Sequence, residues 1–270
     1  HAFFKALLFL GSGSVIHAFN EEQDIRNMGG VWKKIPYTYF LMLIGTLALT
    51  GFPFLSGFYS KDAIIEFAFF KHSVVGNYAM TIGIITAFLT SIYSWRLFFK
   101  TFHGSFNNKK FSIEKIHESP ATMLIPLIFL AIGAIFSGYI FKDIFIGNNN
   151  KFWDDSIFFL KETKHDLVPF LLLILTPIIV VIAIPLSYYY FVKNVKILEE
   201  FKKTNLPLYN FLLNKWYIDE LYEIIFVKPL KKIGDIFWKK GDQNIIDRFG
   251  PDGFSKLISF FSTKIVHFQS

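Results

Sequence analysis

Two lysines lie inside apolar stretches of the sequence, and each has a second titratable side chain close by. Lys5 follows His1 by four residues in the apolar stretch that begins the chain. Residues four apart share one face of a helix, so this pair could pass a proton along that face. An ionisable residue inside an apolar span costs at least ~2.5–3.5 kcal/mol, which points to a functional role. A simpler alternative places Lys5 close to the membrane interface.

Lys61 is followed directly by Asp62, and Glu66 lies about one helical turn further on. These residues come after the segment 51–57, whose glycines and proline interrupt a long apolar stretch. Surrounding lipid and protein disfavour the charged form of a lysine at this position, as does the positive end of the helix that begins there. With a carboxylate beside it, such a lysine could carry a proton reversibly. The alternative is an ion pair between Lys61 and Asp62 that holds the interruption together.

The composition favours a membrane protein. Of 270 residues, 53% are hydrophobic and 18% charged, with 35 phenylalanines and no cysteine. One water-bounded core cannot bury so much apolar surface, so lipid must cover part of it. The lack of cysteine excludes disulfides, thiolate nucleophiles, structural Cys-zinc sites and cysteine-ligated iron–sulfur clusters. Because the lysines and arginines behind the net charge of +7 lie between apolar runs, we expect a lipid bilayer and no nucleic acid as partner.

Apolar stretches long enough to cross the ~30 Å of a bilayer recur along the first part of the chain. They cover about residues 1–19, 37–71, 78–99, 122–141 and 167–192. The second would reach ~50 Å as one helix, so we expect the segment 51–57 to divide it into two half-helices. We therefore predict an all-α fold in which residues 1–193 form a polytopic transmembrane helix bundle with one discontinuous helix. Since the first helix is already under way at His1, we expect the chain to be part of a longer protein.

The character of the sequence changes after the fifth stretch. Beyond a predicted linker at 194–208, residues 209–268 alternate apolar and basic clusters at helical spacing. We predict a long amphipathic helix that lies along the membrane surface and is broken near Gly250. Basic loops at 26–34 and 96–115 fall on the same side of the membrane, which is then the cytoplasmic side, or the matrix side in an organelle. The alternative is a polar tail packed against its own bundle.

Three motifs occur in the order typical of one membrane family. They are His1 to His17 followed by Glu22 to Gly30, the segment Gly51 to Asp62, and the segment Asn214 to Tyr222. Together they resemble the largest antiporter-like membrane subunit of proton-pumping NADH:quinone oxidoreductase, respiratory complex I. The resemblance covers essentially the whole chain. It implies an antiporter-like half-domain and a lateral helix that contacts other membrane-arm subunits, especially neighbouring antiporter-like subunits.

The same resemblance implies a proton-translocating enzyme subunit that is driven by electron transfer elsewhere. Lys5 matches the lysine of the family's central proton relay, with His1 before it on the same helix. Lys61 matches the broken-helix lysine at the outward half-channel, with Asp62 beside it. No cofactor is expected in this chain, since flavin, iron–sulfur clusters and quinone are bound in or between partner subunits. The family's N-terminal half has no counterpart in the sequence.

Two other functions remain open at this point. The large subunit of multisubunit cation/proton antiporters shares the broken helix, although the motif at 214–222 and the basic lateral segment favour the oxidoreductase. A purely structural role would make the lateral helix a brace that clasps the membrane arm. For the location we expect the bacterial inner membrane rather than the mitochondrial inner membrane.

Overall fold

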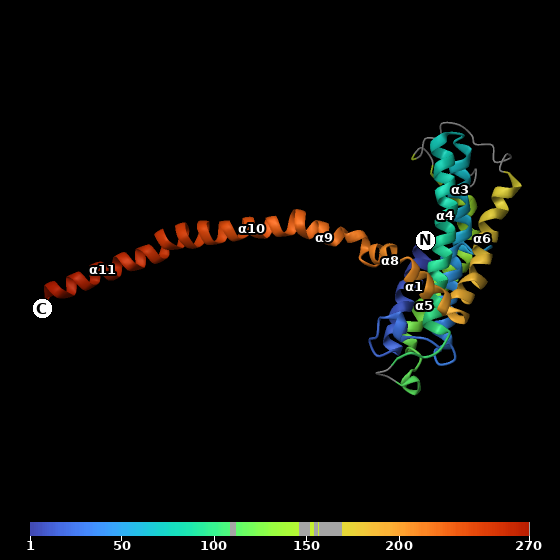
Figure 1. Cartoon of the computed structure of the whole chain (residues 1–270), viewed down its shortest axis with the longest axis horizontal. Helices are drawn as coiled ribbons and strands as arrows, with labels where there is room; N and C mark the ends of the chain where they lie inside the picture. The colour runs from blue at the N-terminus through green and yellow to red at the C-terminus, as the bar shows by residue number, and fades with distance from the viewer. Residues whose placement is uncertain (109–111, 146–151, 154–155, 157–168, 270) are drawn as a thin grey trace. The chain divides into compact units, whose positions relative to one another are not determined.

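The chain folds into helices joined by loops. The computed structural model describes residues 1–108, 112–145, 152–153, 156 and 169–269, and within these ranges it contains helices and no strand (Figure 1). The chain divides into two compact units, His1–Leu198 and Glu199–Ser270. The predicted all-α fold is confirmed.

The first unit is a bundle of apolar helices. Their bounds are α1 Ala2–Ala18, α2 Pro36–Thr50, α3 Ser56–Phe70, α4 Val74–Phe102, α5 Ala121–Phe145 and α6 Phe170–Tyr188. Short 3-10 turns, η1 Ile25–Asn27 and η2 Ile113–Lys115, lie in the loops, and the π-helical turn η5 Tyr189–Lys193 extends α6. Residues 167 and 168, the predicted start of the fifth stretch, lie outside the described residues.

Length and composition separate these helices into two groups. Among the described residues, three helical segments are long and apolar enough to cross a membrane, namely Val74–Phe102, Ala121–Phe145 and Leu172–Lys193. The helices α1 and α2 are apolar but shorter. The long apolar stretch at 37–71 is divided between α2 and α3, so neither half alone has the length of a full span.

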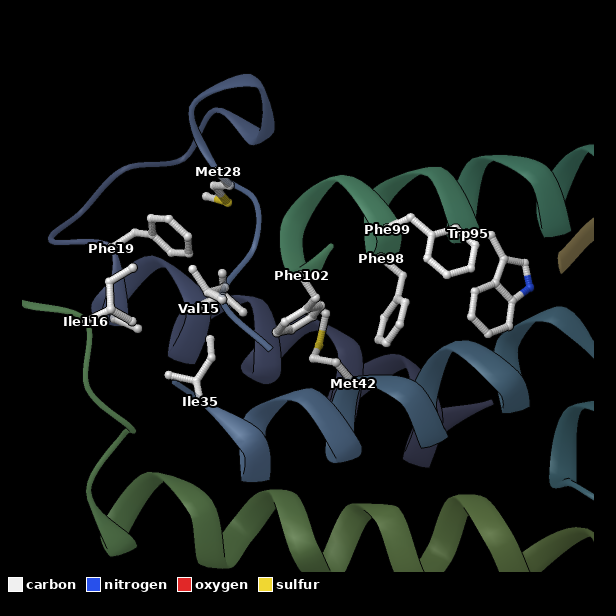
Figure 2. Packing of buried hydrophobic residues seen from close by; sticks show 12 residues of the cluster. Val15, Phe19, Met28, Ile35, Met42, Trp95, Phe98, Phe99, Phe102 and Ile116 are labelled. Carbon is white, nitrogen blue, oxygen red and sulfur yellow. The ribbon is translucent and has the colours of Figure 1, made fainter. Parts of the chain in front are cut away.

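Two clusters of buried apolar side chains hold the bundle together. In the first, Trp95, Phe98 and Phe102 of α4 lie over Met42 of α2 and Val15 of α1 (Figure 2). The second cluster consists of Phe4, Leu7, Leu41, Ala48, Leu127, Ala131 and Ala134. Helix α2 therefore packs against α1, α4 and α5 at once, and this packing determines where its C-terminal end lies.

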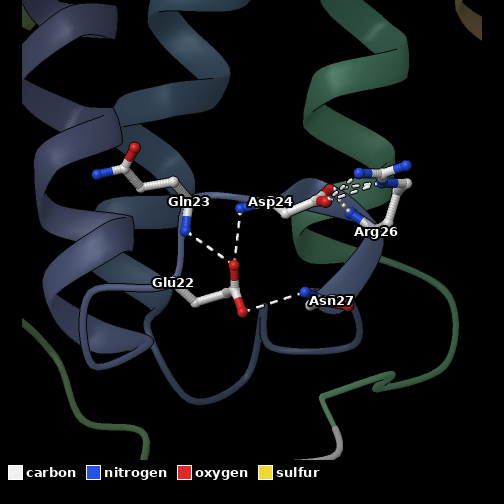
Figure 3. Close-up of polar contacts among 5 residues, drawn as sticks. All are labelled: Glu22, Gln23, Asp24, Arg26 and Asn27. Carbon is white, nitrogen blue, oxygen red and sulfur yellow. Dashed lines mark hydrogen bonds and ion pairs between the residues drawn. The ribbon is translucent and has the colours of Figure 1, made fainter.

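Two carboxylates stabilise the loop after α1 through hydrogen bonds within the loop (Figure 3). Glu22 accepts hydrogen bonds from two backbone N–H groups, at 3.1 and 3.0 Å, and from Nδ2 of Asn27 at 3.1 Å. The guanidinium of Arg26 binds the carboxylate of Asp24, with Nε–Oδ2 and Nη2–Oδ2 distances of 2.8 and 2.5 Å. These hydrogen bonds to its charged form lower the pKa of Asp24 to about 2. The carboxylate of Asp24 therefore stays charged, and the ion pair with Arg26 stays intact, until the pH falls to about 2.

The rest of the chain is an almost continuous run of helical residues. Its elements are α7 Val195–Thr204, α8 Leu206–Leu213, η6 Lys215–Tyr217, α9 Ile218–Tyr222, η7 Glu223–Val227, α10 Lys228–Ile236, η8 Phe237–Asp247 and α11 Pro251–Gln269. The predicted linker at 194–208 contains the boundary between the two units, after Leu198, and it is helical. Its apolar residues Val195, Leu198 and Phe201 recur at helical spacing, and α7 forms there.

The predicted break near Gly250 coincides with the boundary between η8 and α11, and a second irregularity lies at 215–217. Three consecutive residues have left-handed backbone conformations, with φ of 52°, 64° and 57° at Lys215, Trp216 and Tyr217. Near the predicted break, the N–H of Gly250 donates to the carbonyl of Ile246 at 2.8 Å, and the N–H of Phe254 donates to Gly250 at 2.9 Å. Pro251 begins α11, where the first position of a helix needs no N–H donor. These two hydrogen bonds keep the backbones of η8 and α11 connected across the boundary.

Candidate functional site

The break between α2 and α3 is built around two glycines. Gly51 has a φ of +85°, in the left-handed region, which ends α2. A Cβ on Gly57 would lie 1.8 Å from the carbonyl oxygen of Ala48. The backbones of the two half-helices therefore touch at this point, and only glycine fits there.

The ammonium of Lys61 lies at the C-terminal end of α2. Its Nζ donates hydrogen bonds to the carbonyl oxygens of Leu49 at 3.2 Å and of Thr50 at 3.0 Å. Carbonyls in the last turn of a helix have no N–H partner within the helix, and the negative end of the helix dipole attracts a cation. The side chain reaches back across the break, so the negative end of α2 acts on this ammonium in addition to the predicted positive end of α3.

Asp62 is the next residue on α3, yet it does not hold the ammonium. Both side chains are half-buried. In the part of the chain that the structure describes, Nζ of Lys61 is hydrogen-bonded to carbonyl oxygens and forms no ion pair with Asp62. Successive residues on a helix do not face each other, which explains why the two side chains diverge. The contact that closes the break is thus between Lys61 and the end of α2.

The other two predicted site residues, His1 and Lys5, lie on an exposed face of α1. Every fourth residue of this helix shares the face, and all five are exposed: His1, Lys5, Phe9, Gly13 and His17. Phe9 is 77% exposed. The expectation that Lys5 is buried is wrong for the described residues, because none of their helices covers this face. The structure therefore does not bring Lys5 to Lys61.

His1 also borders a cavity of about 260 Å³ at the start of α3. Its polar lining consists of His1, Ser56, Tyr59, Ser60, Ser137 and Lys142. The hydroxyl of Ser56 is buried and has no hydrogen-bond partner among the residues that the structure describes. The ammonium of Lys142 lies 5.6 Å from the ring centroid of Tyr59. The volume is sufficient for several water molecules at ~30 Å³ each, beside polar groups that can bind them.

Two polar contacts at the other end of α2 were not predicted. The carboxylate of Glu118 accepts hydrogen bonds from the N–H groups of Tyr37 at 2.8 Å and Thr38 at 3.3 Å, and from the Thr38 hydroxyl at 2.5 Å. Nε2 of His103, which follows the last residue of α4, lies 3.2 Å from Oη of Tyr39. Burial lowers the pKa of His103. No spacing in the sequence connects either residue to α2.

The chemistry that these side chains offer is the binding and release of protons. Lys61, Asp62 and His1 supply an ammonium, a carboxylate and an imidazole, which are groups that take part in general acid–base transfer. Among the residues in the described ranges, no group of three or more His, Asp or Glu side chains is placed to hold a metal ion.

Comparison with known proteins assigns the family. Residues 1–90 match a family model described as NADH:quinone oxidoreductase/Mrp antiporter, TM. Residues 93–270 match the model described as NADH dehydrogenase subunit 5 C-terminus. The chain belongs to the NADH dehydrogenase subunit 5 family. The resemblance predicted from the sequence motifs is therefore confirmed.

Relatives in the subunit 5 family align with all or nearly all of this chain. Proteins named NADH-ubiquinone oxidoreductase chain 5 from Phytophthora infestans and Chondrus crispus are each 42% identical, over 277 and 290 residues. The protein of that name from Arabidopsis thaliana is 39% identical over 283 residues. Each alignment covers 100% of this chain and 42% of the relative, so the chain spans less than half the length of these subunit 5 proteins.

Proposed function

We propose that this chain is part of a membrane-arm subunit of NADH:quinone oxidoreductase, and that Lys61 binds and releases the translocated proton. Membership of the subunit 5 family supports the first statement. The observation that carries the second is the hydrogen bonding of Nζ of Lys61 to Leu49 and Thr50 at the break in an apolar helix. Broken helices at membrane depth place unpaired carbonyls where a transported cation or proton carrier can use them.

The proton step follows from this geometry. The ammonium of Lys61 gives one proton to water and becomes a neutral amine, and the end of α2 then loses the positive charge that balances it. Asp62 follows Lys61 on α3, and Ser60, the residue before Lys61, lines the cavity at the start of α3, which has room for water. Electron transfer in other subunits supplies the free energy. Lys61 returns to the ammonium when a proton arrives from the other side of the membrane.

The source of that proton lies on the exposed face of α1. His1 and Lys5 share this face with Phe9, an arrangement that is costly in water and in lipid unless another helix covers it. The relatives contain more than twice the length of this chain. In the proposal, a helix of the longer protein covers the face, and Lys5 passes the proton on towards Lys61.

Replacement of Lys61 in the intact complex tests the proposal. In reconstituted vesicles, Lys61→Ala should lower the number of protons translocated per electron pair. The matched control is Lys71→Ala, which removes an exposed lysine just after α3 and should leave the ratio unchanged. An unchanged ratio in Lys61→Ala would show that Lys61 does not carry protons.

The C-terminal unit extends the proposal to partners. Apolar residues such as Leu221, Ile224 and Ile233 are about half exposed along it and alternate with lysines. A helix of this type requires a covering surface, which we assign to the neighbouring antiporter-like subunits and the membrane surface. A photo-crosslinking residue at Ile233 should capture a neighbouring subunit more efficiently than one at Lys232. Equal yields at the two positions would contradict an oriented contact.

The location that we propose is the mitochondrial inner membrane. The expected bacterial inner membrane is not supported, because the relatives come from eukaryotes such as an oomycete, a red alga and a flowering plant. The basic loops then face the matrix. Apolar helices long enough to cross a bilayer are consistent with a multi-pass membrane protein.

Redox cofactors belong to partner subunits in this proposal. The chain has no cysteine to ligate an iron–sulfur cluster, and flavin and quinone would bind in or between other subunits. The alternative of a multisubunit cation/proton antiporter is compatible with the model that matches residues 1–90. The match of residues 93–270 to the subunit 5 C-terminus favours the oxidoreductase. Copurification with flavin and iron–sulfur subunits would distinguish the two.

A further inference from the structure

The N-terminus of α2 is capped by a side chain that is distant in the sequence. Pro36 begins the helix and has no N–H, and the N–H of Tyr39 already bonds to the carbonyl of Ile35 at 2.9 Å. The free N–H groups of the first turn are therefore those of Tyr37 and Thr38. Both donate to Oε2 of one carboxylate, that of Glu118.

Glu118 also binds the side chain of this turn. The hydroxyl of Thr38 is fully buried and donates to Oε1 of Glu118 at 2.5 Å. Both carboxylate oxygens are thus occupied by α2. The residue at the N-cap position, Ile35, has no polar side-chain atom and cannot cap the helix itself. Without Glu118, the first turn of α2 would keep two unpaired N–H groups.

The opposite end of α2 is satisfied in a corresponding way. The carbonyls of Leu47 and Ala48 accept N–H groups from residues just after the helix. The remaining two carbonyls, those of Leu49 and Thr50, accept Nζ of Lys61. An anion therefore holds the positive end of this helix and a cation holds its negative end. The two charges are bound to one helix of 15 residues, which is about 22 Å long at 1.5 Å per residue.

We infer that Glu118 is a positioning residue for proton transfer at Lys61. A packed helix moves as a rigid element, so the contact that fixes its first turn also fixes the axial position of its last carbonyls. Those carbonyls are the acceptors that hold the ammonium. The inference rests on the proposed function of Lys61, and it adds a residue on a separate loop, far along the chain, that controls where the proton carrier is bound.

The test compares variants in the intact complex, with protons per electron pair measured per assembled complex. Glu118→Gln removes the charge, and Thr38→Val removes the hydroxyl that Glu118 binds. Both should lower the ratio, and both should slow coupled turnover about 2- to 30-fold, the range expected for loss of a helix cap. Glu118→Asp keeps the charge and should restore part of the ratio. The KM for NADH and for quinone should not change.

Matched controls separate positioning from loss of packing. Thr46 is also buried on α2, but its hydroxyl donates to the carbonyl of Met42 within the same helix, at 2.7 Å, and not to a loop. Thr46→Val should therefore keep the wild-type ratio. Glu114→Gln changes an exposed carboxylate on the same loop as Glu118 and should also have no effect.

Each outcome decides between defined alternatives. A wild-type ratio in both Glu118→Gln and Thr38→Val would overturn the positioning role while leaving Lys61→Ala to test the proposed function. A wild-type ratio in Lys61→Ala would overturn the proposed function itself. If Glu118→Gln prevents assembly, Thr38→Val decides alone. Adding Glu118→Gln to Lys61→Ala should lower the proton-to-electron ratio little further, because Glu118 and Lys61 act through the same helix, α2.

Discussion

Gly57 of α3 rests on Ala48 of α2 with no room for a side chain between them. A Cβ at position 57 would stand 1.8 Å from the Ala48 carbonyl oxygen and 3.7 Å from the ring of Phe4. The first contact is with backbone, which cannot turn aside as a flexible side chain could. The backbones of the two half-helices are therefore in direct contact. This contact determines how far the Cα of Lys61 lies from the last carbonyls of α2.

Gly57→Ala should separate the half-helices. We expect the free energy of unfolding to fall by about 1–3 kcal/mol, the usual cost of overpacking, and Lys61 to lose its hydrogen bonds to α2. Thermal denaturation of the purified complex and its proton-to-electron ratio measure both effects. Gly13→Ala is the control, because a Cβ on this exposed glycine of α1 meets nothing within 4 Å. Equal stability of the two variants would mean that the contact at Gly57 is not tight.

His103 should make the end of the bundle at the N-terminus of α2 sensitive to acid. Burial holds its pKa below the ordinary value of 6.5, so the unfolded chain binds the proton more readily than the folded chain. The stabilisation by neutral His103 is complete above pH 6.5 and decreases as the pH falls from 6.5 towards the lower pKa of the folded state. His103→Gln retains a polar partner for Tyr39 without titrating. Its melting temperature should therefore fall less between pH 7.5 and pH 5.5 than that of the wild type.

Lys215 should tolerate glycine better than a β-branched residue. Its φ of 52° is left-handed, a conformation that costs roughly 1–2 kcal/mol for residues with a Cβ and more for branched ones. Its exposed ion pair with Asp219, at 3.2 Å, contributes little. Lys215→Val should therefore be less stable locally than Lys215→Gly by about 1–2 kcal/mol. Hydrogen exchange of the amides in α9 measures the difference, and equal protection would argue against a left-handed turn.

The break in the membrane helix was predictable because its cause is local. Gly51, Pro53 and Gly57 fall within one short segment of an apolar stretch too long for the bilayer, and backbone chemistry alone indicates an interruption there. The acceptors of Lys61 were not predictable in this way. Whether the side chain extends along α3 or back to α2 depends on how the half-helices pack, which no periodicity reports.

The roles of Glu118 and Lys5 depend on contacts between distant parts of a chain. Glu118 caps a helix that ends 68 residues before it, and one sequence carries no sign of such a pairing. Lys5 lies in a stretch whose apolar composition suggested burial, yet its face of α1 is open. Composition indicates how much surface must be covered, but not which helix covers it.

The C-terminal unit combines an irregularity that the sequence signals with one that it does not. Gly250 and Pro251 are strong local signals for a turn, and the boundary between η8 and α11 lies there. At 215–217 no residue is a glycine, and the chain nevertheless takes three left-handed conformations in succession. The ring of Trp216 stacks on Phe211 at 5.9 Å, and Asn214 donates to Oη of Tyr217 at 3.0 Å. These contacts offset a strain that the sequence does not reveal.

The contact at Gly57 fixes the point about which α3 can tilt relative to α2, and we call this point the fulcrum. Lys61 is four residues from the fulcrum, about 6 Å along α3, whereas Phe70 at the far end is about 20 Å away. A tilt of α3 that carries Phe70 through 3 Å therefore moves the backbone at Lys61 by about 1 Å. Swinging of α3 in the bilayer is scaled down before it reaches the ammonium. Sliding of α2 along its axis is not scaled down in this way, because the carbonyls that hold the ammonium move with it.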